Sequence, residues 1–308
     1  MRYRKRRFVS GECMHVYQRT IGGVNIFYDL EDYIVFYTIF SIVSRMYRIS
    51  VLELCVMIDH VHMLLSSDVL SEISRFIQHY TSLFMREYNI GVGRKGSLFH
   101  KSFGSAPKKG GKKIRSAIVY VGNNPVEKGL CKRAVEYRWN FLAYMVTDNP
   151  FSSLRPASVC SRKLRDAVRE VAGCFGQDEY LSYARVRRMF SKLRDDEKEI
   201  LTDHIIKTYF PFDKETLLSF YDSYGDMLNA MDSTSGSEYD LKEKYYYGTD
   251  IVYKDMLKMV GEKVKPVRQV TVLPDEEKFE FAQHLQDRTF GTSQQISKFL
   301  HMNFVARN

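Results

Sequence analysis

The sequence predicts an α+β fold with one antiparallel sheet, followed by a mainly α-helical C-terminal region. In the first half of the chain, segments rich in β-forming side chains alternate with segments whose apolar residues recur at helical spacing. Their order is strand, helix, strand, strand, helix, strand, helix, which is that of a ferredoxin-like sandwich. After residue 150 the pattern changes to one that is mainly helical. The 308 residues are 44% hydrophobic, so the chain can bury one substantial core and has room for a second.

The first strand and the first helix are expected over residues 13–20 and 30–47. The strand segment is rich in β-formers and ends at the turn signal Ile21-Gly-Gly. Asp29 can cap the helix, and two acids follow in the first turn, where the helix dipole favours negative charge. Apolar residues lie on most sides of this helix, so we expect it to be deeply buried.

The next three elements are expected at short intervals. Residues 50–57 and 60–65 have strand composition and are joined by a tight turn around Asp59. Ser71 can cap a second helix, in which one face is apolar.

A strand over residues 96–105 is expected to lead into a lysine–glycine loop at 107–113. Another helix then starts at about Lys112. In a sandwich of this kind helices cover one face of the sheet and the other face is open.

His60 and His62 are the first candidate functional residues. Side chains alternate along a strand, so two histidines separated by one residue point to the same face. Two imidazoles on a rigid strand can hold one divalent metal ion. An isolated pair of this spacing is more often structural, so it needs support from elsewhere in the chain.

Tyr120 lies sixty residues further along, in the segment Tyr-Val-Gly-Asn-Asn-Pro-Val. A tyrosine brought beside a metal could attack a phosphodiester. Ile118 and Val119 precede it, so the alternative interpretation is a core aromatic residue.

The charge distribution is compatible with a polyanionic partner. The net charge is +9, which many soluble proteins share. Residues 1–7 carry five basic side chains, and residues 94–115 carry eight with no acid. Phe99, His100 and Phe103 interleave the second run and could offer stacking surfaces beside phosphate-binding cations. The alternative is a solvated loop and a frayed terminus.

Cysteine usage and hydropathy argue against several classes of protein. The five cysteines form no C-x-x-C pair and no zinc-ligand spacing, which indicates free thiols in a reducing cytoplasm. The basic start lacks the apolar region of a signal peptide. The longest apolar stretch, at 33–43, is too short to span a bilayer. We therefore expect a cytoplasmic protein without a membrane segment.

Five segments in order resemble one known family. They are Met14-His-Val-Tyr-Gln-Arg19, Ile26-Phe-Tyr-Asp-Leu-Glu-Asp-Tyr33, Met57-Ile-Asp-His-Val-His-Met-Leu-Leu65, Tyr120-Val-Gly-Asn-Asn-Pro-Val-Glu-Lys-Gly129 and Tyr137-Arg-Trp-Asn-Phe-Leu-Ala-Tyr144. Together they cover about residues 10–150 and resemble the single-tyrosine HUH transposases, in particular the REP-associated tyrosine transposase branch of the IS200-like superfamily. The chain departs from that branch at Ile58-Asp59, where the branch often has Pro-Asn.

The resemblance implies a metal-dependent single-stranded DNA endonuclease and strand transferase. It implies that Tyr120 is the nucleophile, forming a 5′-phosphotyrosine link, and that His60 and His62 bind the metal. In the family a polar residue four after the tyrosine completes the metal shell, which points to Asn124 and to Mg²⁺ or Mn²⁺. Asn124 precedes Pro125, however, and could instead cap a new helix.

The implied partner is single-stranded DNA that carries hairpins formed by palindromic repeats, bound by a monomer or a homodimer associated with the nucleoid. Basic side chains near the N-terminus and around the lysine–glycine loop are expected to contact the DNA: Arg2, Arg4, Arg6, Lys108, Lys109, Lys112, Lys113 and Arg115. A domesticated, non-catalytic hairpin-binding protein is one alternative. A relaxase or replication-initiator nickase is another. The roles of Asp59 and His15 stay open, and His15 is more readily explained as structural.

The sequence predicts two domains, at residues 1–150 and 151–308. Helices are expected in the second at 161–171, 179–193, 197–209 and 214–224, with a serine-rich linker at 232–240. The end of the chain, at about 275–308, resembles the first two helices of a helix-turn-helix, with a capping box that starts at Thr292. A helical hairpin that covers the core is an equal alternative.

Overall fold

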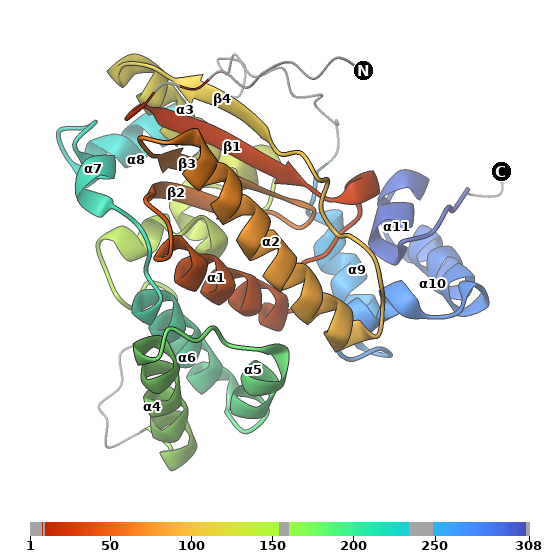
Figure 1. Cartoon of the computed structure of the whole chain (residues 1–308). Helices are drawn as coiled ribbons and strands as arrows, with labels where there is room; N and C mark the ends of the chain where they lie inside the picture. The colour runs from red at the N-terminus through yellow and green to blue at the C-terminus, as the bar shows by residue number, and fades with distance from the viewer. Residues whose placement is uncertain (1–7, 9, 154–159, 234–248, 306–308) are drawn as a thin grey trace.

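The computed structural model describes residues 8, 10–153, 160–233 and 249–305, and its centre is a four-stranded antiparallel sheet (Figure 1). The strands are β1 (Cys13–Arg19), β2 (Ser50–Val56), β3 (His60–Ser66) and β4 (Gly104–Lys108). Their order in the sheet is β2-β3-β1-β4. This order and the helices between the strands confirm the predicted ferredoxin-like α+β sandwich.

Two helices, α1 (Leu30–Ser44) and α2 (Leu70–Val92), cover one face of the sheet (Figure 1). Asp29 occupies the N-cap position of α1, as predicted, and its main-chain amide donates to Oδ2 of Asp32 at 2.8 Å. Helix α1 is buried on nearly all sides. The hydroxyl of Tyr37 donates to the carbonyl of Ile206 at 2.8 Å, so a second helical layer packs on the side of α1 that faces away from the sheet.

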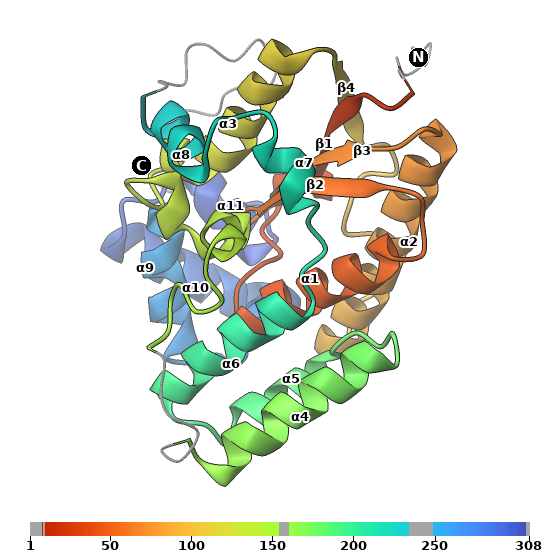
Figure 2. The same cartoon turned by 90° about the vertical axis from the view of Figure 1, so that its left-hand side faces the viewer.

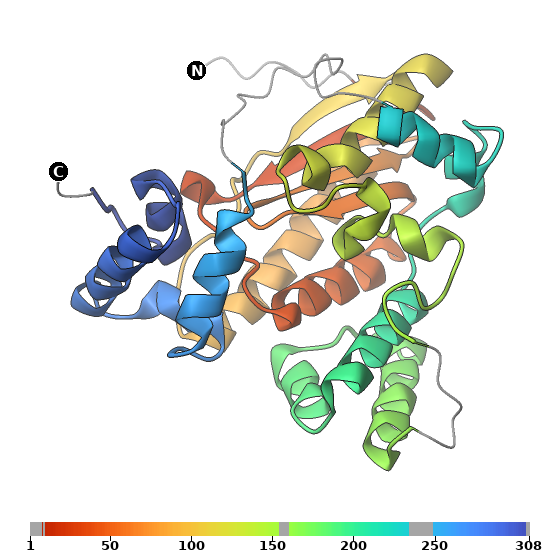
Figure 3. The ribbon, with the colours of Figure 1, turned by 180° about the vertical axis from the view of Figure 1, so that it is seen from behind.

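The opposite face of the sheet is covered too, so the expected open face is wrong. Helix α3 (Gly111–Glu127) packs on β2 and β3, and short helical turns over residues 134–145 lie beside it (Figure 3). The reason is the composition of α3: its apolar face, which includes Ile118 and Val121, is buried against the strands.

Three local predictions differ from the structure. The fourth strand is shorter and later than expected, because residues 96–103 form only an isolated bridge at Phe99 before β4 begins. Helix α2 begins at Leu70, so Ser71 lies inside its first turn instead of capping it. Helix α3 runs through Pro125, so Asn124 does not cap a new helix.

The second half is helical, as predicted. Its helices are α4 (Arg162–Gly176), α5 (Tyr183–Phe190), α6 (Asp195–Thr208), α7 (Lys214–Leu218), α8 (Tyr224–Ser233), α9 (Val252–Gly261), α10 (Asp275–Arg288) and α11 (Ser293–Leu300). Helices α4, α5 and α6 lie beyond α1 (Figure 2). One helix is expected at 214–224. The structure has the shorter α7 at the start of this range, and α8 begins at Tyr224.

Two hydrophobic clusters hold these parts together. The larger one contains buried residues from Cys13 to Met231 and so continues across residue 150. The smaller one joins α9, α10 and α11 to Tyr28 and Ile58 of the sandwich. The division at residue 150 stays a prediction.

The capping box and the apolar face predicted for the last helix are confirmed. Helix α11 begins with the capping box of Thr292 and Gln295. Its apolar face, Ile296, Phe299 and Leu300, is buried in the smaller cluster, as expected of helices that cover a core. The helix-turn-helix stays a prediction, and the described residues after α11, 301–305, contain no further helix. No helix within the described ranges is long and apolar enough to cross a membrane.

One fully buried cation ties the C-terminal region to the start of α1. Arg268 lies in a 3-10 helix, η6 (Val267–Val272). Its guanidinium donates to Asp32 at 3.2 Å and to Glu31 at 2.6 Å, and stacks 4.2 Å from the ring of Tyr183. Burial raises the pKa of Asp32 to about 6, although Arg268 acts against this shift. Removal of the guanidinium would leave a buried carboxylate without its compensating charge.

We therefore expect Arg268→Met to lower the free energy of unfolding by about 3–5 kcal/mol at pH 8, measured by urea denaturation. The pKa of Asp32 is raised in the folded state, so protonation as the pH falls through 6 favours the fold. The deficit should therefore shrink at pH 5. Arg187→Met removes an exposed partner of Glu31 and should cost less than about 1 kcal/mol at either pH. A deficit for Arg268→Met as small as that of Arg187→Met would contradict the role given to Arg268.

Candidate active site

The predicted site begins as a row of side chains across the sheet. His62 on β3 pairs with Cys55 on β2 and with Tyr17 on β1, and Tyr17 pairs with Gly104 on β4. Residues directly opposite each other on antiparallel strands face the same side. The row Cys55–His62–Tyr17–Gly104 therefore lies on the face covered by α3. His60, two residues before His62, is on that face as well.

Helix α3 places Tyr120 on this row. The ring of Tyr120 lies 5.4 Å from the ring of His62 and perpendicular to it. It has the same separation from His15 on β1, also edge-on. The rings of His60 and His62 are 4.9 Å apart. The structure thus brings together the three residues that the sequence singled out, although they come from two distant segments.

His62 is completely buried and has one nitrogen available. Its Nδ1 shares a hydrogen bond of 3.0 Å with Nε2 of His15, whereas its Nε2 has no hydrogen-bond partner among the described residues. Burial, with neighbouring positive charge, holds the pKa of His62 well below its ordinary value. Burial and Lys108 lower that of His15 to about 3. Both rings are therefore neutral near pH 7, which is the form that binds metals.

His60 has a similar arrangement. Its Nδ1 lies 2.5 Å from Oδ1 of Asp59, which accepts the hydrogen bond. Histidines that bind metals through Nε2 normally donate Nδ1–H to such an acceptor, which fixes the tautomer and the ring orientation. Asp59 can fill this role for His60, and His15 can fill it for His62. The sequence left Asp59 undecided and described His15 as structural, because strand register is needed to place His15 beside His62.

These residues fit a divalent metal ion, and the third ligand is less defined. Among the residues that the structure describes, no group of three or more His, Cys, Asp or Glu side chains is arranged to hold a metal. An oxygen from another side chain or from a substrate would have to complete the shell. The side-chain amide of Asn124 donates to the main-chain carbonyl of Tyr120 at 2.9 Å, one helical turn away. Its role as a ligand, and the identity of the metal as Mg²⁺ or Mn²⁺, stay predictions.

The predicted DNA-binding cations gather at the start of α3. Lys108 ends β4 and is half-buried, and the others are exposed: Lys109, Lys112, Lys113 and Arg115. The lysine–glycine loop is shorter than expected, because Lys112 and Lys113 lie in the first turn of α3. Cations are disfavoured at a helix N-terminus, whereas an anion is favoured there. A phosphate would relieve this repulsion.

Other predicted contacts are not supported or cannot be placed. Phe99 and Phe103 are buried, so they do not form the expected stacking surface, whereas His100 is exposed. Both phenylalanines belong to the main hydrophobic cluster. Arg2, Arg4 and Arg6 lie outside the described residues.

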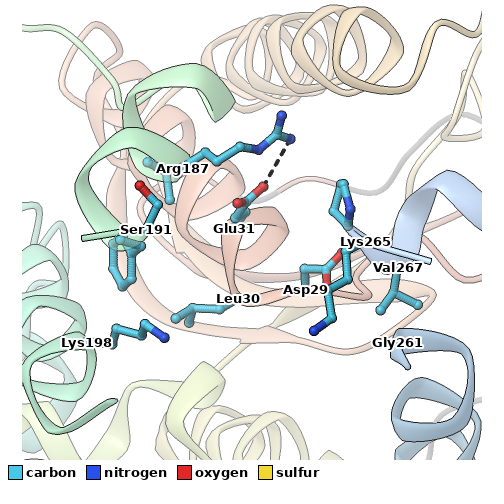
Figure 4. A pocket seen from close by; sticks show the side chains of 12 residues that line it. Asp29, Leu30, Glu31, Arg187, Ser191, Lys198, Gly261, Lys265 and Val267 are labelled. Atoms are coloured by element: carbon cyan, nitrogen blue, oxygen red, sulfur yellow. Dashed lines mark hydrogen bonds and ion pairs between the residues drawn. The ribbon is translucent and has the colours of Figure 1, made fainter. Parts of the chain in front are cut away.

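A separate cavity of about 520 Å³ lies between the start of α1, helix α5 and the segment before η6 (Figure 4). Its walls include Leu30, Phe190 and Val267, and the ion pair of Arg187 with Glu31 lies at its edge. None of the candidate active-site residues lines it.

Known proteins match the part of the chain that forms this site. Residues 14–124 match the family described as transposase IS200-like. A solved structure of a REP-associated tyrosine transposase bound to a REP hairpin aligns with 53% of this chain and 98% of that chain, with 16% identity and a TM-score of 0.39. No curated protein gave a significant match.

Tyr17 reaches its place beside His62 only because residue 104 is glycine. A Cβ atom at Gly104 would lie 1.9 Å from the ring of Tyr17. We expect Gly104→Ala to displace this ring and to lower the free energy of unfolding by about 1–3 kcal/mol, measured by urea denaturation. The same change in a Tyr17→Ala background should cost much less, because the clash is gone. Gly173→Ala on α4, where nothing lies within 4 Å, is the matched control and should not destabilise. Equal costs in both backgrounds would show that Tyr17 is not the cause.

Proposed function

We propose, from the match of residues 14–124 to the IS200-like transposase family, that this chain is a metal-dependent endonuclease and strand transferase that acts on single-stranded DNA through Tyr120. One observation carries the proposal. The ring of Tyr120 lies against His62, a neutral and buried imidazole whose Nε2 has no partner among the described residues. A nucleophile and a ligand nitrogen on the same sheet face are the two parts that this chemistry requires.

The residues around Tyr120 would bind the metal or support its ligands. His60 and His62 would bind Mg²⁺ or Mn²⁺ through their Nε2 atoms, and Asn124 would add an oxygen ligand. Asp59 and His15 would accept the Nδ1 hydrogens and so keep both Nε2 lone pairs available. When bound, the metal would polarise the scissile phosphate and stabilise the charge of the transition state.

The reaction is a transesterification. The phenolic oxygen of Tyr120 forms a bond to phosphorus as the bond from phosphorus to the 3′ oxygen breaks. The phenol loses its proton and the 3′ oxygen gains one, so the products are a 5′-phosphotyrosine and a free 3′-hydroxyl. Joining is the reverse step with another 3′-hydroxyl, and it needs no ATP because the bond energy is retained.

Burial of Tyr120 favours transfer over hydrolysis. Only 5% of the residue is exposed, under a helix that excludes water from the sheet face. A phosphotyrosine formed here would be shielded from attack by bulk water until a DNA end arrives.

We propose that the substrate carries hairpins, as the resemblance of residues 10–150 to the REP-associated branch implies. The cations at the start of α3 would hold its backbone close to Tyr120, because the same helix carries both. Contacts of this kind position the strand but do not read its sequence.

The first test of this function is a covalent adduct. Wild-type protein incubated with hairpin-bearing single-stranded oligonucleotides and Mn²⁺ should give a slower band on a denaturing gel. Tyr120→Phe should give none and yet retain DNA binding, because only the nucleophilic oxygen is lost. Tyr47→Phe, away from the site, is the control and should retain the adduct. No adduct with the wild type would remove the catalytic claim, and an adduct with Tyr120→Phe would assign the nucleophile elsewhere.

The second test concerns the basic start of α3. Lys112→Gln together with Lys113→Gln should weaken binding to single-stranded DNA. Loss of two phosphate contacts should also make the slope of log K against the logarithm of salt concentration shallower by about 1.4. Fluorescence anisotropy at several salt concentrations measures both quantities. Lys192→Gln with Lys258→Gln removes the same charge from exposed positions elsewhere. If both pairs of substitutions have the same effect, the start of α3 has no special role.

A further inference from the structure

The turn before His60 is built into the C-terminal helices. Ile58 is 5% exposed and belongs to the hydrophobic cluster of α9, α10 and α11, with Tyr253 and Phe299. This is the position at which the chain departs from the Pro-Asn of the REP-associated branch. An apolar side chain at residue 58 therefore serves to anchor the turn in a region outside the sandwich.

Asp59, the second residue of that departure, is also linked to α11. Its Oδ1 accepts the hydrogen bond from Nδ1 of His60, and its Oδ2 lies 4.0 Å from Nζ of Lys298. Both side chains are mostly buried, with 18% exposure for Lys298 and 22% for Asp59. The carboxylate thus stands between the metal-binding imidazole and a lysine from the far end of the chain.

Main-chain contacts fix α11 to the same turn. The amide of Asn25 donates to the carbonyl of Lys298 at 3.1 Å, and the ring of His301 contacts the carbonyl of Asn25 at 2.6 Å. The next amide, of Ile26, donates to the carbonyl of Ile58 at 2.9 Å. Lys298 therefore approaches Asp59 from a backbone whose position relative to the turn is already set.

Other charges surround Asp59 at this boundary. Burial and the nearby Asp59 raise the pKa of Asp250 to about 6, and Lys128 and Lys298 act against this shift. The amide of Asp250 donates to the carbonyl of Lys128 at 2.8 Å. Two acids, Asp59 and Asp250, thus lie near two lysines next to His60, and one of these lysines, Lys298, belongs to α11.

We propose that Lys298 is a positioning residue for the metal site, which holds the Asp59 carboxylate so that Nε2 of His60 stays directed at the metal. This inference rests on the proposed function, because it assumes that His60 binds a metal. Helices α9–α11 then support the turn that carries His60. Ile58 packs in their hydrophobic cluster, and Asp59 faces Lys298 of α11.

The test measures Mn²⁺ affinity without DNA, by titration calorimetry on the full chain. Lys298→Met keeps the apolar stem and removes the charge, and we expect about tenfold weaker binding, as for loss of a residue that supports a metal ligand. Asp59→Asn should weaken binding at least as much. The double variant should match Asp59→Asn, because Lys298 acts through Asp59. Lys258→Met on α9, an exposed lysine of the same region, should bind as the wild type does.

The outcomes separate the two proposals. Thermal unfolding first shows that each variant is folded. The positioning role is wrong, and the proposed function stands, if the Mn²⁺ affinity of Lys298→Met is within twofold of the wild-type affinity. The same holds if the effects of Lys298→Met and Asp59→Asn on Mn²⁺ affinity multiply in the double variant. If Lys298→Met weakens DNA binding and its salt dependence with Mn²⁺ affinity unchanged, Lys298 is a DNA contact. If the folded wild type binds no Mn²⁺, the metal site itself is wrong.

Discussion

The packing of α3 on the sheet is the interaction on which the rest of the site depends. It buries Cys55 and His62, places Tyr120 on His62, and makes both His62 and His15 neutral by removing them from water. The approach is close. A Cβ atom at Gly122 would lie 2.7 Å from Met231 on α8 and 3.2 Å from Glu53 on β2. Helix and sheet can meet at this distance because residue 122 has no side chain, and the geometry of the candidate active site is a direct consequence.

This packing encloses polar groups that a purely structural interface would avoid. Both carboxyl oxygens of Glu53 and Nε2 of His62 are buried without hydrogen-bond partners among the described residues. Burial raises the pKa of Glu53 well above its ordinary value, which favours the neutral form and reduces the cost of enclosing the group. A neutral imidazole with an unused nitrogen also costs free energy in a dry interface. Such a cost is expected at positions kept for binding or catalysis, where local rules of stability are broken.

The sequence was sufficient where a local signal determined the outcome. Asp29 and Thr292 occupy the N-cap positions of α1 and α11, and the alternation of side chains through His60 and His62 indicates β3. Capping and strand periodicity depend on only a few neighbouring residues. It was insufficient where distant segments decide. The pairing of His15 with His62 needs the register of β1 on β3, the burial of Phe99 needs the whole core, and Pro125 is held within α3 by packing that overrides its local preference.

In addition to the smaller hydrophobic cluster, two cations of the C-terminal region face acids of the sandwich. Arg268 neutralises Asp32 and Glu31 at the start of α1, and Lys298 approaches Asp59 at the start of β3. Both contacts flank the segment at residues 20–29, whose amides at 26 and 27 donate to the carbonyl of Ile58. A displacement of η6 or α11 would therefore be transmitted to the turn that carries His60, whereas β3 itself is held by two neighbouring strands. His62 is thus positioned by the sheet, while His60 is positioned by the sheet together with the C-terminal helices. The two ligands of the proposed metal site thus depend on different parts of the fold, and under the proposed function a change in the C-terminal helices would alter the position of His60 and leave that of His62 unchanged.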